Sequence, residues 1–188
     1  MENYKVINEI NYCSNFKEDN KLATNYAKAR LGKELQLKGE EDYSKRLIEI
    51  TSNKIFNTFT ETLGDIAYEI LNSFVSASYY EDKLCNIFID VNVNISIDNV
   101  LIPKVVDVVI VSKEKIEVIK ISSFDYDRIN PREDLELRVM AYGAVKFFSR
   151  ITKANTISLI CIQPNLREGT VYDMRIDKLI RECEEAFM

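Results

Sequence analysis

The pattern of apolar and polar positions predicts helices in the first part of the chain and a change to strands near residue 87. Apolar residues recur every three or four positions over 20–37, 40–51 and 54–76, which predicts three helices. Asn20 has a side chain that caps helices and is the expected start of the first one. Over 87–97, isoleucine and valine alternate with mostly polar residues, which is the pattern of a half-buried strand.

The stretch 104–122 is expected to form the centre of the fold. It consists of two mostly apolar strands, 104–112 and 115–122, joined by a short charged turn. Strands that are apolar on both sides are typical of the buried middle of a sheet. Each strand carries one charged residue that departs from this pattern, Asp107 in the first and Lys120 in the second. Because a buried charge is costly unless it is paired, both side chains need partners.

The remainder of the chain predicts a crossover helix and further strands. A polar loop over 123–130 leads to a helix over 131–149, with Asn130 as its expected N-cap and Pro131 at its first position. Strands over 156–163 and 170–174 and an amphipathic helix over 176–186 follow. A helix between strands favours an α/β fold, with a central mixed sheet of about four or five strands flanked by helices after an N-terminal helical region.

Composition and charge exclude several classes of protein. The 188 residues include only five glycines and three prolines and no linker, which predicts one domain over 1–188, with a helical part at 1–80 and a sheet core at 81–188. The absence of histidine excludes every histidine-dependent catalytic triad. No long apolar segment or signal-peptide pattern is present, so the protein is expected to be cytoplasmic and not bound to a membrane.

One local group of basic residues contrasts with the formal net charge of −5. Lys28, Arg30 and Lys33 lie close together in the first predicted helix. The simpler interpretation is a solvated helix face, and the alternative is a contact to nucleic acid. The negative net charge argues against a general polyanion binder.

Five short strings, in order along the chain, are similar to segments of one nuclease superfamily. They are NYCS at 11–14, VVDVVIV at 105–111, IEVIKIS at 116–122, DLELRVMAYGAV at 134–145 and ICIQPNLREGTVYDM at 160–174. With the predicted strand–strand–helix–strand order, they make the chain resemble the PD-(D/E)XK nucleases. The nearest branch is the RecB-type one, which includes CRISPR-adaptation exonucleases and phage-encoded relatives. The resemblance covers most of the chain from Asn11 on, is weak over 39–78, and implies a restriction-endonuclease-like core.

This resemblance implies a metal site whose residues are largely replaced here. The first acidic ligand for Mg²⁺ or Mn²⁺ in that family corresponds to Asp107 and is kept. The second acidic ligand corresponds to Lys120, and the family's lysine corresponds to Ser122. A glutamine on the family's crossover helix corresponds to Glu136. Asp107 is therefore the one unchanged member of the hairpin's three functional positions.

Two interpretations of the altered site stay open. In one, Asp107, Glu136 and a loop aspartate, Asp125 or Asp127, hold Mg²⁺ or Mn²⁺ in an active nuclease. In the other, no cofactor is bound, because the ammonium group of Lys120 takes the metal position between Asp107 and Glu136.

The resemblance leads to one favoured function and two alternatives. The favoured interpretation is a catalytically inactive nuclease-fold protein of phage or mobile-element type that binds a partner protein, for example as an inhibitor of a host nuclease or CRISPR system. One alternative is a non-catalytic DNA-binding accessory protein that uses Lys28, Arg30 and Lys33. The other is a metal-dependent DNA exonuclease or endonuclease with rearranged ligands.

Overall fold

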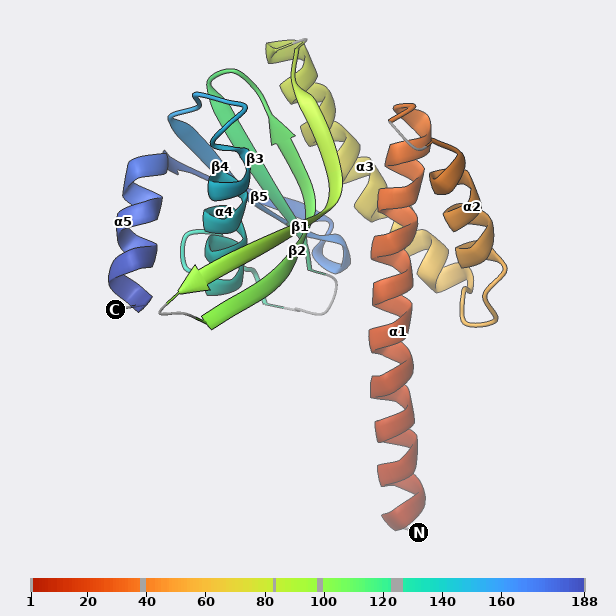
Figure 1. The fold of residues 1–188 in the computed structure, drawn as a ribbon. Helices are drawn as coiled ribbons and strands as arrows, with labels where there is room; N and C mark the ends of the chain where they lie inside the picture. The colour runs from red at the N-terminus through yellow and green to blue at the C-terminus, as the bar shows by residue number, and fades with distance from the viewer. Residues whose placement is uncertain (1, 38–39, 83, 98–99, 123–126, 188) are drawn as a thin grey trace. The chain divides into compact units, whose positions relative to one another are not determined.

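The chain divides into two compact units, Met1–Glu69 and Ile70–Met188. The computed structural model describes residues 2–37, 40–82, 84–97, 100–122 and 127–187 (Figure 1). The boundary between the units lies inside helix α3 (Thr58–Glu81), after Glu69, whereas the expected division between a helical part and a sheet core lies after residue 80. Whether the whole chain acts as one domain stays a prediction.

The first unit contains α1 (Glu2–Glu34), α2 (Glu40–Thr51) and the beginning of α3. The bounds of α2 agree with the prediction. The expectation that Asn20 is an N-cap is wrong, because Asn20 is fully buried in the middle of α1. Residues 2–19 contain no proline or glycine that would stop a helix. Their apolar residues do not recur at a clear helical spacing, so the pattern did not predict this part of α1.

Helix α1 is terminated by a residue in the left-handed conformation, and this residue is a glutamine, Gln36, where glycine is usual. Gln36 has a positive φ of 51°, and Leu37 N–H donates to the carbonyl oxygen of Gly32 at 3.0 Å. This is the hydrogen bond of a Schellman motif, in which glycine usually takes the left-handed position. The helix therefore ends slightly before residue 37, where the apolar pattern placed its end.

The second unit is built on a five-stranded mixed sheet. Its strands are β1 (Asn86–Ile97), β2 (Val100–Val111), β3 (Lys115–Ile121), β4 (Thr156–Gln163) and β5 (Glu168–Arg175). They lie in sequence order across the sheet, and every neighbouring pair is antiparallel except β3 and β4, which are parallel. The predicted α/β class, with a mixed sheet flanked by helices after a helical region, is confirmed.

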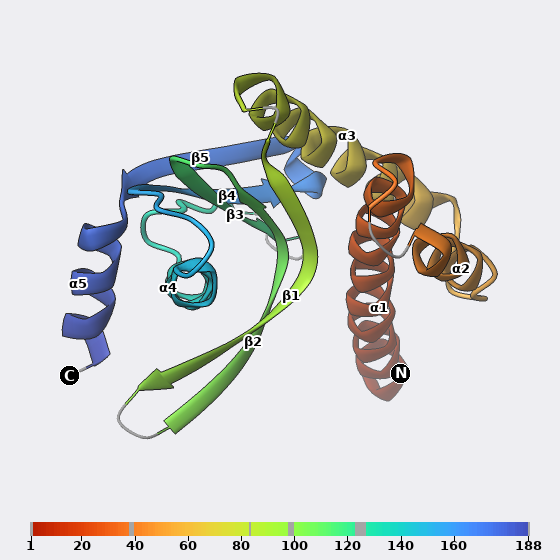
Figure 2. The same cartoon turned by 45° about the horizontal axis from the view of Figure 1, so that its top comes forward.

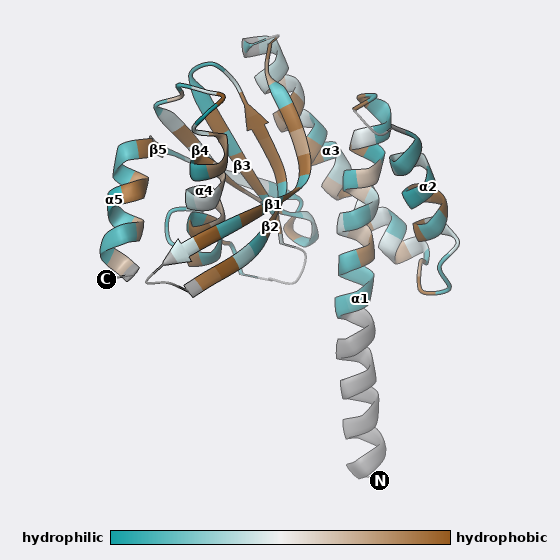
Figure 3. Cartoon of the chain, viewed as in Figure 1, coloured by the Kyte–Doolittle hydropathy of each residue, from teal (hydrophilic) through white to brown (hydrophobic). Residues whose placement is uncertain are grey.

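Helices cover both faces of this sheet. The parallel pair is joined through α4 (Leu135–Phe148), which lies on the concave side, where β1 and β2 curve around it (Figure 2). The end of α3 lies on the other face, where Phe74 packs close to Gly169 of β5. The short helix η1 (Pro164–Leu166) follows β4, and α5 (Ile176–Phe187) packs beside α4. Apolar residues are concentrated in the central strands, as Figure 3 shows.

The N-cap of the crossover helix lies four residues later than Asn130, at Asp134, so the predicted N-cap is wrong. Asn130 instead forms a turn, in which its side chain accepts Arg132 N–H at 3.1 Å. The cap is Asp134, which has an extended backbone and accepts Leu137 N–H through Oδ1 at 3.0 Å. Both segments offer a capping side chain, so the sequence pattern alone did not separate them. This correction matters because Asp134 also takes part in the candidate site.

A close contact of α4 with β1 gives a first stability prediction. Gly143 lies against Val93 and Ile95, and a Cβ atom added there would be 2.8 Å from Val93 Cγ2. Gly143→Ala is therefore expected to lower the free energy of unfolding by about 1–3 kcal/mol, although alanine is the better helix former. Urea denaturation followed by circular dichroism measures this, and Gly143→Val should cost more. A stabilised Gly143→Ala protein would contradict the contact.

None of the described helices combines the length and the apolarity that crossing a membrane requires.

Candidate functional site

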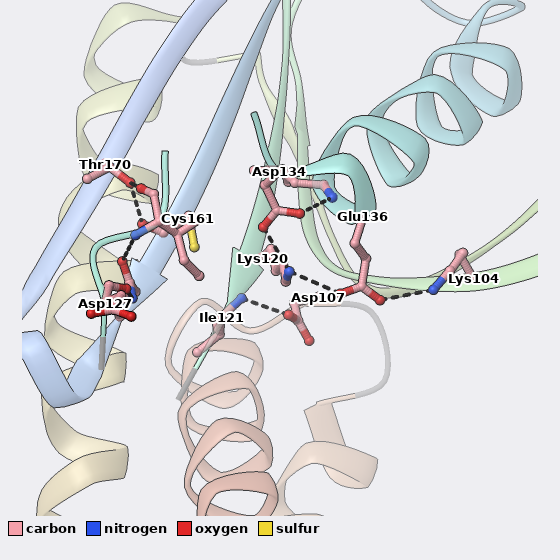
Figure 4. Close-up of polar contacts among 12 residues, drawn as sticks. Lys104, Asp107, Lys120, Ile121, Asp127, Asp134, Glu136, Cys161 and Thr170 are labelled. Atoms are coloured by element: carbon pink, nitrogen blue, oxygen red, sulfur yellow. Dashed lines mark hydrogen bonds and ion pairs between the residues drawn. The ribbon is translucent and has the colours of Figure 1, made fainter. Parts of the chain in front are cut away.

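The clearest polar feature of the second unit is a group of charged side chains around Lys120. Lys120 Nζ lies 2.9 Å from Asp134 Oδ2 and 3.0 Å from Glu136 Oε2 (Figure 4). The other carboxylate oxygen of Glu136 lies 2.9 Å from Lys104 Nζ. We call Lys104, Lys120, Asp134 and Glu136 the lysine–carboxylate cluster.

Three secondary-structure elements position the cluster. Lys120 projects from β3 on the side opposite Glu117, because side chains alternate along a strand. Glu117 instead accepts a hydrogen bond from Ser78 of α3, on the other face of the sheet. Asp134 and Glu136 come from the cap and first turn of α4, and their negative charges also suit the positive end of that helix. Lys104 reaches Glu136 from β2.

The cluster differs in one partner from the predicted arrangement. The expected contact of Lys120 with Glu136 is present. Among the described residues, the second carboxylate within ion-pair distance of Lys120 Nζ belongs to Asp134 and not to Asp107. Asp107 Oδ2 accepts Ile121 N–H at 2.8 Å, so this carboxylate is tied to the backbone of β3 beside Lys120. Asp134 is the residue of the cluster that sequence reasoning missed.

Ser122 and Asp127, which were also named from the sequence, lie outside the lysine–carboxylate cluster. Ser122, where the resemblance implied the position of a nuclease lysine, is 5% exposed directly after β3, and its N–H donates to the carbonyl oxygen of Ile162. Asp127 is exposed, and its carbonyl oxygen accepts a hydrogen bond from Gln163 Nε2. Asp125 lies outside the described residues. The cluster therefore draws its carboxylates from α4 and its cap.

Asp90 of β1 is a further acidic residue, and it lies opposite Asp107 of β2. The register of β1 and β2 pairs Ile89 with Val108 and Val91 with Val106, which places Asp90 opposite Asp107. Asp90 has a positive φ of 53°, a conformation that aspartate tolerates better than most residues. Such backbone strain persists only where the surrounding structure imposes it. The alternating pattern of β1 gave no sign of this irregularity.

The charges of the cluster stabilise one another. Burial by itself lowers the pKa of Lys120, but hydrogen bonds to Asp134 and Glu136 and their negative charges outweigh it, so the pKa is raised. The pKa of Glu136 is lowered, first by the hydrogen bond from Lys104 and then by the one from Lys120. Lys120 is thus a charged ammonium group held by two acceptors at neutral pH.

Stability at acid pH should reflect the lowered pKa of Glu136. A carboxyl whose pKa is lower in the folded state adds stability above its ordinary value, near 4.5, and loses it as the pH falls through the lower folded pKa. We therefore expect Glu136→Gln to lose less stability than the wild type between neutral pH and pH values below 4.5. Urea denaturation at several pH values tests this, with Glu133→Gln, an exposed neighbour, as the control. Parallel curves for the wild type and Glu136→Gln would contradict the pairing.

The cluster is poorly suited to hold a divalent cation. Glu136, which the rearranged metal cage requires, already lies between two ammonium groups at 2.9 and 3.0 Å. Two positive charges at this distance would repel a metal ion by several kcal/mol at an effective dielectric constant of about 20. Within the described ranges, no group of three or more acidic, cysteine or histidine side chains is placed to hold a metal ion.

The basic residues named from the sequence lie in the first unit and are not equivalent. Lys28 is 6% exposed. Arg30 lies 2.9 Å from both Glu34 and Asp65 and stacks over a tyrosine ring, so its charge is neutralised within the unit. Lys33 is exposed. The three side chains do not form one solvated basic face.

The fold and the cluster define an α/β protein with a mixed five-stranded sheet and a paired lysine near its centre. The chain belongs to a family of proteins of unknown function, DUF2800, whose model matches residues 9–187. No curated protein matches the chain. A solved structure described as "Crystal structure of SSO0001" is 16% identical, with 95% of this chain and 84% of that chain covered. Its TM-score is 0.32.

Proposed function

We propose that this protein is a catalytically inactive relative of the PD-(D/E)XK nucleases and acts by binding a partner protein. The observation that carries the proposal is the position of Lys120 Nζ, 2.9 Å from Asp134 and 3.0 Å from Glu136. In the resembling nucleases this strand position carries an acidic metal ligand. Here a covalently attached cation neutralises the surrounding carboxylates, which removes the electrostatic reason to recruit Mg²⁺ or Mn²⁺.

A protein partner suits this chain better than the two alternatives. An active nuclease needs Glu136 as a ligand, and Glu136 is already bound by Lys104 and Lys120. A DNA-binding accessory role based on Lys28, Arg30 and Lys33 is weakened by the burial of Lys28 and the ion pairs of Arg30. The net charge of −5 also disfavours a polyanion. A setting in a phage or mobile element, with a host nuclease or CRISPR system as the target, is one concrete form of this proposal.

Incubation with DNA and metal ions tests the loss of catalysis. We expect no degradation of linear double-stranded or single-stranded DNA by the wild type with Mg²⁺ or Mn²⁺, and no difference between the wild type and Asp107→Ala. Metal-dependent degradation that disappears in Asp107→Ala would overturn the proposal and establish an active nuclease. Binding of DNA without cleavage, weakened by salt and by Lys33→Glu, would instead favour the accessory role.

A further inference from the structure

The end of α4 combines exposed apolar side chains with several cations. Phe147 and Ile151 are 59% and 65% exposed. Lys146, Arg150 and Lys153 are also exposed in the same stretch of sequence. We call these five residues the α4-end patch. Single exposed apolar residues are ordinary on protein surfaces, so the feature of interest here is that two of them lie among three cations in an acidic chain.

The patch lies beside the turn between β2 and β3, at one end of the sheet (Figure 1). Thr152, within the patch sequence, donates a hydrogen bond to the carbonyl oxygen of Ser112 at 2.8 Å. Lys113 in that turn is exposed, and its N–H donates to Asp82 Oδ2. Asp82 Oδ1 accepts the N–H of Leu84, which is 85% exposed. One further cation, Lys113, and one further apolar side chain, Leu84, therefore border the patch, together with the acidic residues Asp82 and Glu114.

Most cations of this surface form no ion pair with the described carboxylates. Within the described part of the chain, no carboxylate lies within ion-pair distance of Lys113, Arg150 or Lys153. Lys146 Nζ lies 3.7 Å from Glu184, but both side chains are half exposed, and such pairs contribute little. The segment 146–153 itself carries three cations and no acidic residue, in a chain whose net charge is −5.

The apolar part of the patch is held in place by the core. The ring of Phe147 packs edge-on against Phe148, with ring centroids 4.9 Å apart, and Phe148 is 1% exposed. A restrained aromatic side chain loses little conformational entropy when a ligand covers it. Phenylalanine and arginine are also among the residues enriched at protein interfaces, whose rims are polar and solvent-accessible.

We propose that the α4-end patch binds an acidic segment of a partner protein, with apolar side chains of that segment against Phe147 and Ile151 and its carboxylates facing Arg150 and Lys153. The proposal rests on the protein-binding role inferred above and adds the surface and the chemistry of the partner. Phe147 and Ile151 favour a peptide over nucleic acid, because proteins contact the phosphate backbone of nucleic acid mainly through charge. Nucleic acid, an anionic membrane and a second copy of the chain are outcomes that the test separates.

A designed peptide tests the surface without knowledge of the natural partner. The probe is a fluorescein-labelled synthetic helix with glutamate on one face and leucine and phenylalanine on the other, followed by fluorescence anisotropy with the full chain. We expect binding that weakens with salt, and a loss of about tenfold in affinity for Arg150→Glu/Lys153→Glu. Arg167→Glu/Arg181→Glu, which reverses two cations elsewhere in the same unit, should change the affinity less than about twofold.

The apolar contribution has its own matched pair of variants. Phe147→Ser should weaken binding of the peptide by about tenfold, whereas Leu101→Ser, which removes an exposed apolar side chain from β2, should leave it unchanged. Circular dichroism verifies that each variant is folded.

Several results would overturn this proposal. One is that the peptide does not bind at millimolar concentration. Another is that the patch variants and the control variants lose the same affinity for the peptide. A third is that a peptide with lysine in place of glutamate binds equally well. Tighter binding of a DNA oligonucleotide or of phosphatidylglycerol vesicles through the same residues would overturn it too. Self-association lost in Arg150→Glu/Lys153→Glu would assign the surface to a second copy and overturn the proposal of a different partner. None of these results bears on nuclease activity. The proposal for the α4-end patch can therefore be wrong while the proposed loss of catalysis stands.

Discussion

Lys120→Met is expected to lower the free energy of unfolding by about 2–4 kcal/mol, because it leaves two carboxylates without their shared cation. The Lys120 side chain is 15% exposed and the Asp134 side chain is 10% exposed, so water replaces the lost contact poorly. Glu136 keeps Lys104 and is 45% exposed, which limits its share of the loss. The chain has no tryptophan, so urea denaturation followed by circular dichroism is the suitable measurement.

Lys104→Met is the matched control for this prediction. Lys104 contacts the same glutamate, but its side chain is 33% exposed, so its removal should cost less than about 1 kcal/mol. Asp134→Asn adds a second comparison, because asparagine keeps the N-cap of α4 and loses only the charge facing Lys120. Equal stability of Lys120→Met and the wild type would show that the cluster is not a buried ion-pair network.

Gln163→Leu is the second substitution with a large expected effect. Gln163 is fully buried, accepts Ile129 N–H through Oε1 at 2.7 Å and donates through Nε2 to the carbonyl oxygen of Asp127 at 2.8 Å. This amide therefore holds the backbone of Asp127 and Ile129, which lie ahead of the cap of α4. Leucine removes both hydrogen bonds and leaves two partly buried backbone groups unpaired, at an expected total of about 2–4 kcal/mol.

The comparison for Gln163→Leu is Thr170→Val. Thr170 Oγ1 donates to the carbonyl oxygen of Ile129 at 3.3 Å, a longer contact at a more exposed position. Its loss should cost less than about 1 kcal/mol. Limited proteolysis should also cleave Gln163→Leu faster than Thr170→Val between β3 and α4. Equal stability and equal cleavage of the two variants would contradict the role of Gln163.

The sheet could be predicted from the sequence because its strands carry strong local patterns. β1 alternates apolar and polar residues, while β3 and β4 are short apolar runs bounded by polar residues and Pro164. The beginning of α1 could not be predicted from the sequence, because polar residues without an apolar stripe do not distinguish a helix from a loop. The positive φ of Asp90 likewise could not be predicted, because the alternating pattern of β1 continues through it.

The site could be predicted only in part. The need of Lys120 for a partner followed from one charge in an apolar strand, and Glu136 was correctly named as a partner. Asp134 was missed because the expected helix start at Asn130 placed it inside the first turn. Which carboxylate meets a lysine depends on where α4 crosses the sheet, and this crossing is decided by packing such as the contact of Gly143 with β1. Local pattern does not contain that information.

We propose that the ammonium group of Lys120 takes the position that a metal ion occupies in the nucleases this chain resembles. Isothermal titration of Mn²⁺ into the wild-type protein tests this most directly, with Asp107→Ala as the comparison. We expect no saturable heat in the wild type at millimolar Mn²⁺, and identical traces for the two proteins. Stoichiometric Mn²⁺ binding by the wild type that is lost in Asp107→Ala would contradict it.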